Sequence, residues 1–184
     1  MENNLKINLC CGGNYREGYL NVDFSDLRSD KESIKVDLNF DVRKKLPWDD
    51  NSVSEIVFRE SLEHFNRWDG LNILKEIYRV LKPGGKLDLT VPPAQKQMKI
   101  LLQMMSRNII IEDFLDAHGR FSPIKYVDDL MGATHETLID GVDKGQGDSH
   151  KMLFTKQWLE CILKYVGFKI VKIDDNIFVE ARKE

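Results

Sequence analysis

The sequence predicts an α/β fold: a mostly parallel, doubly wound sheet of seven strands that includes an antiparallel C-terminal strand. Three observations predict it. Short apolar or β-branched runs alternate with segments of helical periodicity, the last two runs are joined by only three residues, and the first connection is abridged. We expect helices to cover both faces of this sheet and ligands to bind beyond the carboxyl ends of its strands.

The first two strands flank a pair of glycines. Leu5–Leu9 is a short apolar run, Gly12 and Gly13 follow it closely, and a second run ends on Asp23. Glycines let a backbone approach a ligand closely, and a carboxylate at a strand tip can accept both hydroxyls of a ribose. Taken by itself, the same segment also fits an ordinary hairpin, because paired glycines between apolar runs are a turn signal.

The connection between these strands is unusually short. Cys11–Gly18 spans eight residues, which reach at most about 26 to 29 Å when extended. A parallel connection normally needs a dozen or more residues with its helix. We therefore predict one helical turn or none in this first crossover.

The middle of the chain predicts three strands and one helix. The strands are Ile34–Leu38, Glu55–Phe58 and Lys86–Val91, the last stopped by two prolines. Apolar residues recur at spacings of three and four in the helix, at Leu71, Leu74, Ile77, Tyr78 and Leu81. We expect Lys82–Gly85 to close this helix, with a cation near its negative end and a glycine in the left-handed cap.

The C-terminal part predicts a helix followed by a hairpin. Thr155 can cap the helix, Phe154 can pack onto Leu159, and Gly167 can end it. Its expected buried stripe is Trp158, Leu159, Ile162, Leu163 and Val166. The strands Phe168–Ile173 and Ile177–Ala181 are joined by Asp174, Asp175 and Asn176, which favours antiparallel neighbours.

The strand tips of this sheet carry glycines and carboxylates. Asp23 and Asp37 lie at the ends of predicted strands, and Asp41 and Glu60 follow predicted strands. Spaced carboxylates suit a ligand with hydroxyls, an exocyclic amine and a positive charge. The strand tips have no cluster of lysines that could bind phosphates, so the pattern disfavours ATP as the ligand.

Composition excludes several classes of protein. The chain has 184 residues, 42% of them hydrophobic, and a net charge of -3, so we expect one domain over residues 1–184 and no attraction to nucleic acid through a global positive field. Its apolar runs are too short for a membrane span and its polar start lacks signal-peptide character, which favours a cytoplasmic location. The three cysteines form neither a disulfide framework nor a metal-binding pair, and we expect no metal.

Five segments of the chain occur in the order and spacing of a known family. They are Leu9–Gly13, Asn21–Asp23, Leu46–Val53, Leu62–Phe65 and Glu76–Gly85. In these segments the chain resembles the class I S-adenosylmethionine-dependent methyltransferases of type 11, which have a Rossmann-like fold. The tail from His150 to Phe168 is also similar, and the match leaves out about residues 94 to 147, which we interpret as a substrate-facing insertion.

The resemblance implies S-adenosylmethionine as the cofactor and a role for each matched residue. Cys10, Cys11, Gly12 and Gly13 would pass under its methionine part, and Asp23 would accept the ribose hydroxyls. An aspartate after the third strand would meet the adenine amine: Asp41 fits the spacing better, and Asp37 is the alternative. Glu60 and Ser61 would lie beside the cofactor, whereas His64 is expected to cap or pack at the following helix.

One departure from the family concerns the glycine turn. Relatives usually have Gly-x-Gly where this chain has Cys10, Cys11 and Gly12. We expect Cys10 to adopt a backbone conformation that a side chain allows. The fold survives such a change more easily than tight cofactor binding does.

The reaction implied is methyl transfer to a small-molecule acceptor, for which a sugar or related metabolite is one class. A hydroxyl acceptor would need a base, and His150 is the first candidate, with His118 and His135 behind it; a purely structural His150 is the alternative. Two other functions stay open: a cofactor-binding module without catalysis, and a nucleotide-dependent oxidoreductase. The oxidoreductase is disfavoured because its fingerprint needs a third glycine in a helix that the short crossover cannot hold.

Overall fold

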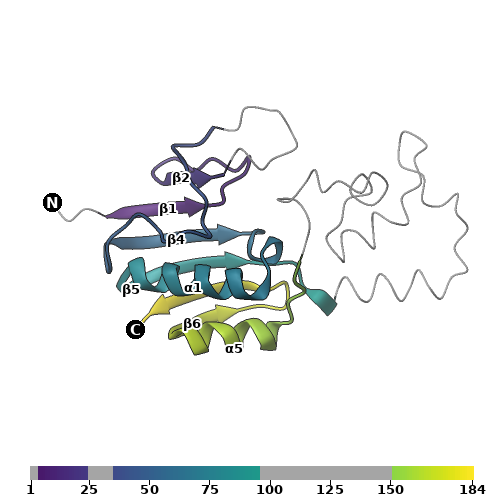
Figure 1. Cartoon of the computed structure of the whole chain (residues 1–184). Helices are drawn as coiled ribbons and strands as arrows, with labels where there is room; N and C mark the ends of the chain where they lie inside the picture. The colour runs from purple at the N-terminus through teal and green to yellow at the C-terminus, as the bar shows by residue number, and fades with distance from the viewer. Residues whose placement is uncertain (1–3, 25–34, 96–150) are drawn as a thin grey trace, which may run out of the picture.

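The molecule is built on a seven-stranded sheet (Figure 1). The structure, a computed structural model, describes residues 4–24, 35–95 and 151–184. The strand order is β3-β2-β1-β4-β5-β7-β6. The strands are β1 (Leu5–Leu9), β2 (Leu20–Asp23), β3 (Leu38–Asn39), β4 (Val53–Arg59), β5 (Leu81–Thr90), β6 (Phe168–Ile173) and β7 (Phe178–Lys183).

The strand directions confirm the predicted sheet. β1 runs parallel to β2 and β4, β2 to β3, and β4 to β5, whereas β7 is antiparallel to both β5 and β6. The hairpin interpretation of the first segment is therefore wrong, because β1 and β2 are parallel. The strand order reverses beside β1, and a ligand crevice is expected at such a point.

The first crossover contains turns and no helix, as predicted. Two buried asparagines hold it in place of helical hydrogen bonds. Asn8 Nδ2 donates to the Asn14 carbonyl at 2.8 Å and to Asn21 Oδ1 at 2.9 Å, and Asn21 Oδ1 also accepts from the Arg16 amide at 2.8 Å. Asparagine side chains thus satisfy backbone groups of the crossover that a helix would otherwise pair.

The third strand is shorter and later than predicted. The sequence predicts Ile34–Leu38, but of the described residues only Leu38 and Asn39 pair with β2. Asp37 explains the difference, because its carboxylate takes the Asn21 amide at 2.8 Å, where a strand carbonyl would otherwise accept. The side chain thus takes one of the two ladder hydrogen bonds, while the Asp37 amide still donates to the Asn21 carbonyl at 2.8 Å.

Helix α1 (Arg67–Val80) ends differently from the prediction. Asn66 caps its start by accepting from the amides of Trp68 and Asp69. The helix stops at Val80 because Leu81 begins β5: it is extended, fully buried and paired with Val53 of β4. The expected glycine cap is therefore wrong: Gly84, at φ 74°, lies inside the segment that forms β5.

Helix α5 (Lys156–Val166) has both of its predicted ends. Thr155 Oγ1 accepts from the Trp158 amide at 3.2 Å, and Gly167 closes the helix at φ 115°. The predicted stripe is wrong for Trp158, which is 38% exposed and stacks on Phe154 with ring centroids 5.1 Å apart. The hairpin is confirmed, although β7 begins one residue later than predicted, at Phe178.

Both described α-helices lie on one face of the sheet (Figure 1). The expectation that helices cover both faces is wrong for the described part of the chain. The other face carries a ladder of charged side chains across four paired strands, with nitrogen to oxygen distances of 3.6 to 3.9 Å. Its members are Lys6, Glu55, Lys86, Glu180 and Arg182. Alternating polar residues suit a sheet face that meets water.

Arg79 joins α1 to the segment that leads into β4. Its guanidinium donates to the carbonyls of Leu46 at 3.0 Å and Trp48 at 2.9 Å, and to the carboxylates of Asp50 and Glu76 at 2.7 Å each. Glu76 in turn accepts from the Leu46 amide at 2.9 Å. The planar fork of five donors that arginine provides is needed to reach partners in several directions.

We predict that Arg79→Met lowers the free energy of unfolding by about 3 kcal/mol, because two part-buried hydrogen bonds to carbonyls are lost and the Glu76 carboxylate keeps only the Leu46 amide as a donor among the described residues. Lysine would recover less than half of the loss, since one ammonium cannot serve partners on both sides. Urea unfolding followed by circular dichroism measures the change.

The matched control is Arg182→Met, whose guanidinium lies exposed on the charged ladder and is expected to contribute less than about 1 kcal/mol. Equal losses for the two variants would show that Arg79 has no special structural role.

Candidate functional site

A pocket of about 330 Å³ lies beyond the carboxyl ends of β1, β2 and β4. It is lined by eight of the predicted site residues: Cys10, Cys11, Gly12, Gly13, Asp23, Asp41, Glu60 and Ser61. The strand topology brings them together from four separate loops. The pocket thus occupies the crevice where ligands of doubly wound sheets bind.

Asp23 ties the glycine turn to the tip of β2. Its Oδ2 accepts from the Gly12 amide at 2.6 Å, and its Oδ1 accepts from the Phe24 amide at 2.7 Å. An ionised carboxylate offers about four lone-pair sites, so both oxygens can accept a further hydrogen bond. The side chain is therefore fixed in place and still able to receive ligand hydroxyls.

The turn itself leaves open space for a ligand. A Cβ added at Gly13 would meet no atom within 4 Å, and Gly12 has φ 52°, in the left-handed region. Cys10 also has a left-handed backbone, at φ 53°, which costs a residue with a side chain about 1 to 2 kcal/mol. This small left-handed region is one that a side chain allows, as expected for Cys10. The turn keeps its left-handed backbone although the first glycine is missing.

The thiol of Cys10 is a neutral group. Burial raises its pKa well above the ordinary value, and the charge of Asp23 acts in the same direction. A thiol held in this form is a poor nucleophile and metal ligand. Cys10 accordingly contributes shape to the pocket rather than reactivity.

The two aspartates near β3 are in different environments. Asp41 lines the pocket and is held by Arg43, whose Nε and Nη2 donate to its two oxygens at 2.8 and 2.9 Å. These hydrogen bonds lower the pKa of Asp41. Asp37 is not among the lining residues: its oxygens accept from Asn21 and from the Tyr15 hydroxyl at 3.0 Å. The geometry favours Asp41 over Asp37 as a ligand contact.

The tip of β4 turns sharply beside the first turn. Glu60 has φ 46°, and its amide donates to the Thr90 carbonyl at 2.9 Å. Ser61 is buried, and its hydroxyl donates to the Arg59 carbonyl at 2.8 Å. Arg59 itself is bound through two hydrogen bonds to Asp88. The positive charge nearest to Glu60 in sequence is thereby directed toward the sheet.

Several lining residues were not predicted from the sequence. Phe24 and Phe40 stand next to the predicted carboxylates, and His64, Asp69 and Lys151 complete the wall. Phe24 and Phe40 could have been predicted as lining residues, because each is the sequence neighbour of a predicted strand-tip carboxylate. His64 was expected only to cap or pack, and it lines the pocket from the short 3-10 helix η2 (Leu62–His64).

The segment that returns to the described part of the chain is anchored on η2. The amides of Lys151 and Met152 donate to the Glu63 carbonyl at 2.6 and 3.1 Å. The Glu63 side chain is 1% exposed, and burial raises its pKa to about 8. His150, His118, His135 and residues 96–147 of the expected insertion lie outside the described residues.

The comparisons with known proteins agree with this geometry. The profile of a methyltransferase domain family matches residues 12–89. An S-adenosylmethionine-dependent methyltransferase of Methanosarcina mazei superposes with a TM-score of 0.59 at 17% identity, covering 100% of this chain and 93% of its own. The profile match supports a methyltransferase family, and the superposition shows that the chain has the fold of an S-adenosylmethionine-dependent methyltransferase. The resemblance of the sequence motifs to this family is confirmed.

Two further solved methyltransferases have the same fold. The one from Thermotoga maritima gives a TM-score of 0.56 at 13% identity, covering 100% of this chain and 84% of its own. The one from Mesorhizobium loti gives 0.54 at 16% identity, covering 97% and 90%. No curated protein sequence matches this chain. The matched methyltransferase family implies S-adenosylmethionine as the cofactor.

Within residues 4–24, 35–95 and 151–184, the chain lacks two features. None of the helices is long and apolar enough to cross a membrane. No three His, Cys, Asp or Glu side chains of that part of the chain gather as metal ligands would.

We predict that Cys10→Val destabilises the protein by about 2 kcal/mol relative to Cys10→Gly, because β-branched residues tolerate a left-handed backbone least. Urea unfolding of the two variants measures the difference. At Cys11, which does not have a positive φ, the same pair of substitutions is expected not to favour glycine. A valine at position 10 that is as stable as glycine would contradict the prediction.

We predict that replacing Glu63 by Gln removes a pH dependence of stability. Between pH 4.5 and about 8 the folded carboxyl keeps a proton that the unfolded one has lost. Rising pH therefore favours unfolding of the native chain by up to about 1.4 kcal/mol per pH unit. The free energy of unfolding measured from pH 5 to 8 should fall more steeply for the native chain than for Glu63→Gln.

The control for this experiment is Glu160→Gln, since the pKa of Glu160 is lowered by its hydrogen bond with Lys164. This variant should keep the pH slope of the native chain. A Glu63→Gln profile parallel to the native profile would show that Glu63 is ionised in the folded protein.

Proposed function

We propose that this protein transfers the methyl group of S-adenosylmethionine to a small-molecule acceptor, and that the pocket at the tips of β1, β2 and β4 holds the cofactor. The observation that carries the proposal is the hydrogen bond from the Gly12 amide to Asp23, which joins an open glycine turn to a strand-tip carboxylate. This pairing supplies a backbone cradle beside two acceptor oxygens for a ribose.

The donor and acceptor set fits this cofactor. Asp23 would accept the ribose hydroxyls, Asp41 the adenine amine, and the turn Cys10–Gly13 would pass under the methionine part. Phe24 and Phe40 offer apolar surface to a planar base. Glu60 and Ser61 would lie beside the cofactor from the β4 side.

The charges of the pocket suit a cationic ligand better than a pyrophosphate. Two of the three described Lys and Arg residues that line the pocket, Arg43 and Arg59, are each bound by an aspartate, and the first crossover contains no helix whose N-terminus could face phosphates. A sulfonium gains nothing from such a positive helix end. These observations weigh against a nucleotide-dependent oxidoreductase.

The bound cofactor supplies an electrophilic methyl group, and the chain aligns the acceptor with it and excludes water. We propose that the acceptor is a small molecule, with a sugar or related metabolite as one option. We also propose that His150 acts as the base. Alanine at His150 would abolish turnover of a hydroxyl acceptor if this histidine is the base. Unchanged turnover would remove it from the mechanism.

A cofactor-binding module without catalysis is the second candidate, favoured by one observation. Cys10 stands in a left-handed turn that suits glycine, so the methionine part and its methyl group would be held out of line for transfer while the rest of the cofactor still binds. Binding of the cofactor without transfer to any acceptor would favour this function.

The decisive experiment is a thermal and chemical unfolding shift with S-adenosylhomocysteine. Ligand at a hundred times its dissociation constant should stabilise the chain by about 2.7 kcal/mol. We predict that Asp23→Ala weakens binding by about a hundredfold, because it removes acceptors for the ribose and loosens the turn.

Asp41→Ala should weaken binding about tenfold, whereas Asp37→Ala, matched in chemistry and outside the pocket, should bind normally once its stability is corrected for. Absence of any shift at millimolar ligand would overturn the proposed function. A larger effect of Asp37 than of Asp41 would reverse the assignment of the adenine contact.

A further inference from the structure

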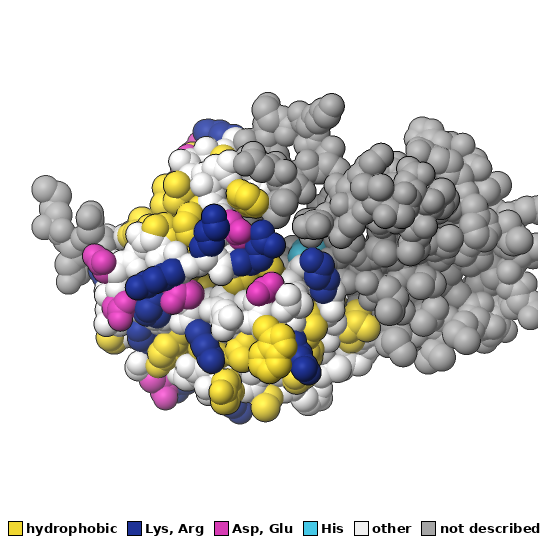
Figure 2. All heavy atoms as spheres, in the orientation of Figure 1, with side chains coloured by type: hydrophobic (Ala, Val, Ile, Leu, Met, Phe, Trp, Pro, Cys, Tyr) yellow, Lys and Arg dark blue, Asp and Glu magenta, His cyan; other side chains and the backbone are white. Residues whose placement is uncertain are grey.

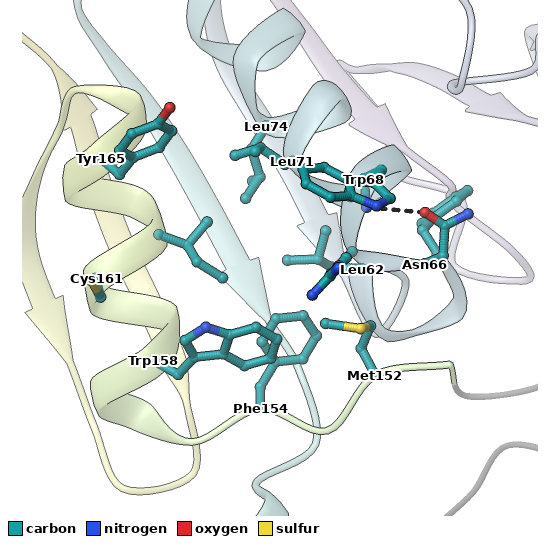
Figure 3. Close-up of a pocket in the computed structure, with 14 residues that line it drawn as sticks. Leu62, Asn66, Trp68, Leu71, Leu74, Met152, Phe154, Trp158, Cys161 and Tyr165 are labelled. Carbon is teal, nitrogen blue, oxygen red and sulfur yellow. Dashed lines mark hydrogen bonds between the residues drawn. The ribbon is translucent and has the colours of Figure 1, made fainter.

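A second hollow lies between α1 and α5, on the face of the sheet that the helices cover (Figure 3). It measures about 270 Å³, and nearly all of its lining is carbon: Leu62, Leu71, Leu74, Phe154, Trp158 and Ile162 are among its residues. We call it the aromatic groove. Its size is just below that of complete small-molecule sites, so it suits one part of a ligand.

The groove concentrates apolar surface that meets water. Four large hydrophobic side chains are exposed in the described part of the chain, and three of them line it: Trp68 at 64%, Trp158 at 38% and Tyr165 at 71%. Hydrophobic side chains gather on this face with Lys and Arg around them (Figure 2). Concentrated exposed apolar surface marks an interaction or ligand site.

The groove lies beside the candidate cofactor pocket, and the two hollows share one wall. Phe65 lines both hollows, and its neighbours alternate between them: Ser61 and His64 face the pocket, and Leu62 and Asn66 face the groove. On the returning segment, Lys151 lines the pocket and Met152 the groove. A molecule with a polar end and an apolar end that lies across the Phe65 wall would contact both hollows.

The charged residues at the groove determine which charge on such a molecule is favoured. Arg67 is the one charged residue among those that line it, and its guanidinium lies 4.8 Å from the Trp68 ring centroid. Lys75 lies 5.8 Å from the ring centroid of Tyr165 at the rim. These cations favour a neutral or anionic group beside the apolar part.

We propose that the aromatic groove binds the alkyl or aryl portion of the methyl acceptor, which places the acceptor among amphipathic molecules rather than free sugars. That the ligand is the methyl acceptor rests on the proposed function. The apolar subsite itself is tested separately from cofactor binding.

The test uses anilinonaphthalene sulfonate, an aryl anion whose fluorescence rises in apolar sites, with the full chain loaded with S-adenosylhomocysteine. We expect saturable binding to the loaded protein, with energy transfer from Trp68 and Trp158. Leu71→Lys should weaken probe binding about tenfold by placing a charge in the groove, and Trp68→Ala, at an exposed position, by about fivefold.

The matched control is Val171→Lys, which changes the exposed hydrophobic residue that lies away from the groove, on β6. It should bind the probe as the native chain does, and all variants should keep the unfolding shift with S-adenosylhomocysteine. The groove proposal fails if the probe competes with S-adenosylhomocysteine, if neither groove variant weakens probe binding, or if sedimentation shows a dimer of the native chain that Leu71→Lys dissociates. Loss of the S-adenosylhomocysteine shift in the native chain would instead overturn the proposed function.

Discussion

The hydrogen bonds of the Arg79 guanidinium are the interaction on which the rest of the structure depends. They fix the segment from Leu46 to Asp50 against the last turn of α1. That segment feeds β4, the strand that lies between β1 and β5 in the sheet. Because the site is built from the tips of β1, β2 and β4, the position of β4 decides whether its carboxylates and glycines meet.

The short first crossover changes how the rest of the fold is supported. A helix there would cover the second face of the sheet and provide backbone donors at its N-terminus. In its place Asn8 and Asn21 hold the turn, and a ladder of charged side chains covers the strands behind it. The cofactor cradle is then made by a turn and one carboxylate, a geometry that suits a cationic ligand.

The short helix η2 and the residues around it form the partition between the two hollows. The buried Glu63, with its raised pKa, anchors the returning segment through its carbonyl. One side of this partition faces the cofactor pocket and the other faces the aromatic groove. A single local structure thus connects the site where the methyl group would be held to the surface that would receive an apolar group.

The sequence by itself determined the features that depend on near neighbours. The cap at Thr155, the stop at Gly167, the C-terminal hairpin and the helix-free crossover follow from residue type and spacing. Only the tertiary structure decided features that depend on distant partners. Asp37 binds Asn21 while Asp41 reaches the pocket, Leu81 leaves its helix to enter β5, and Trp158 stays at the surface. Periodicity assigns a residue to a face of its own helix, but it carries no information on which element lies opposite.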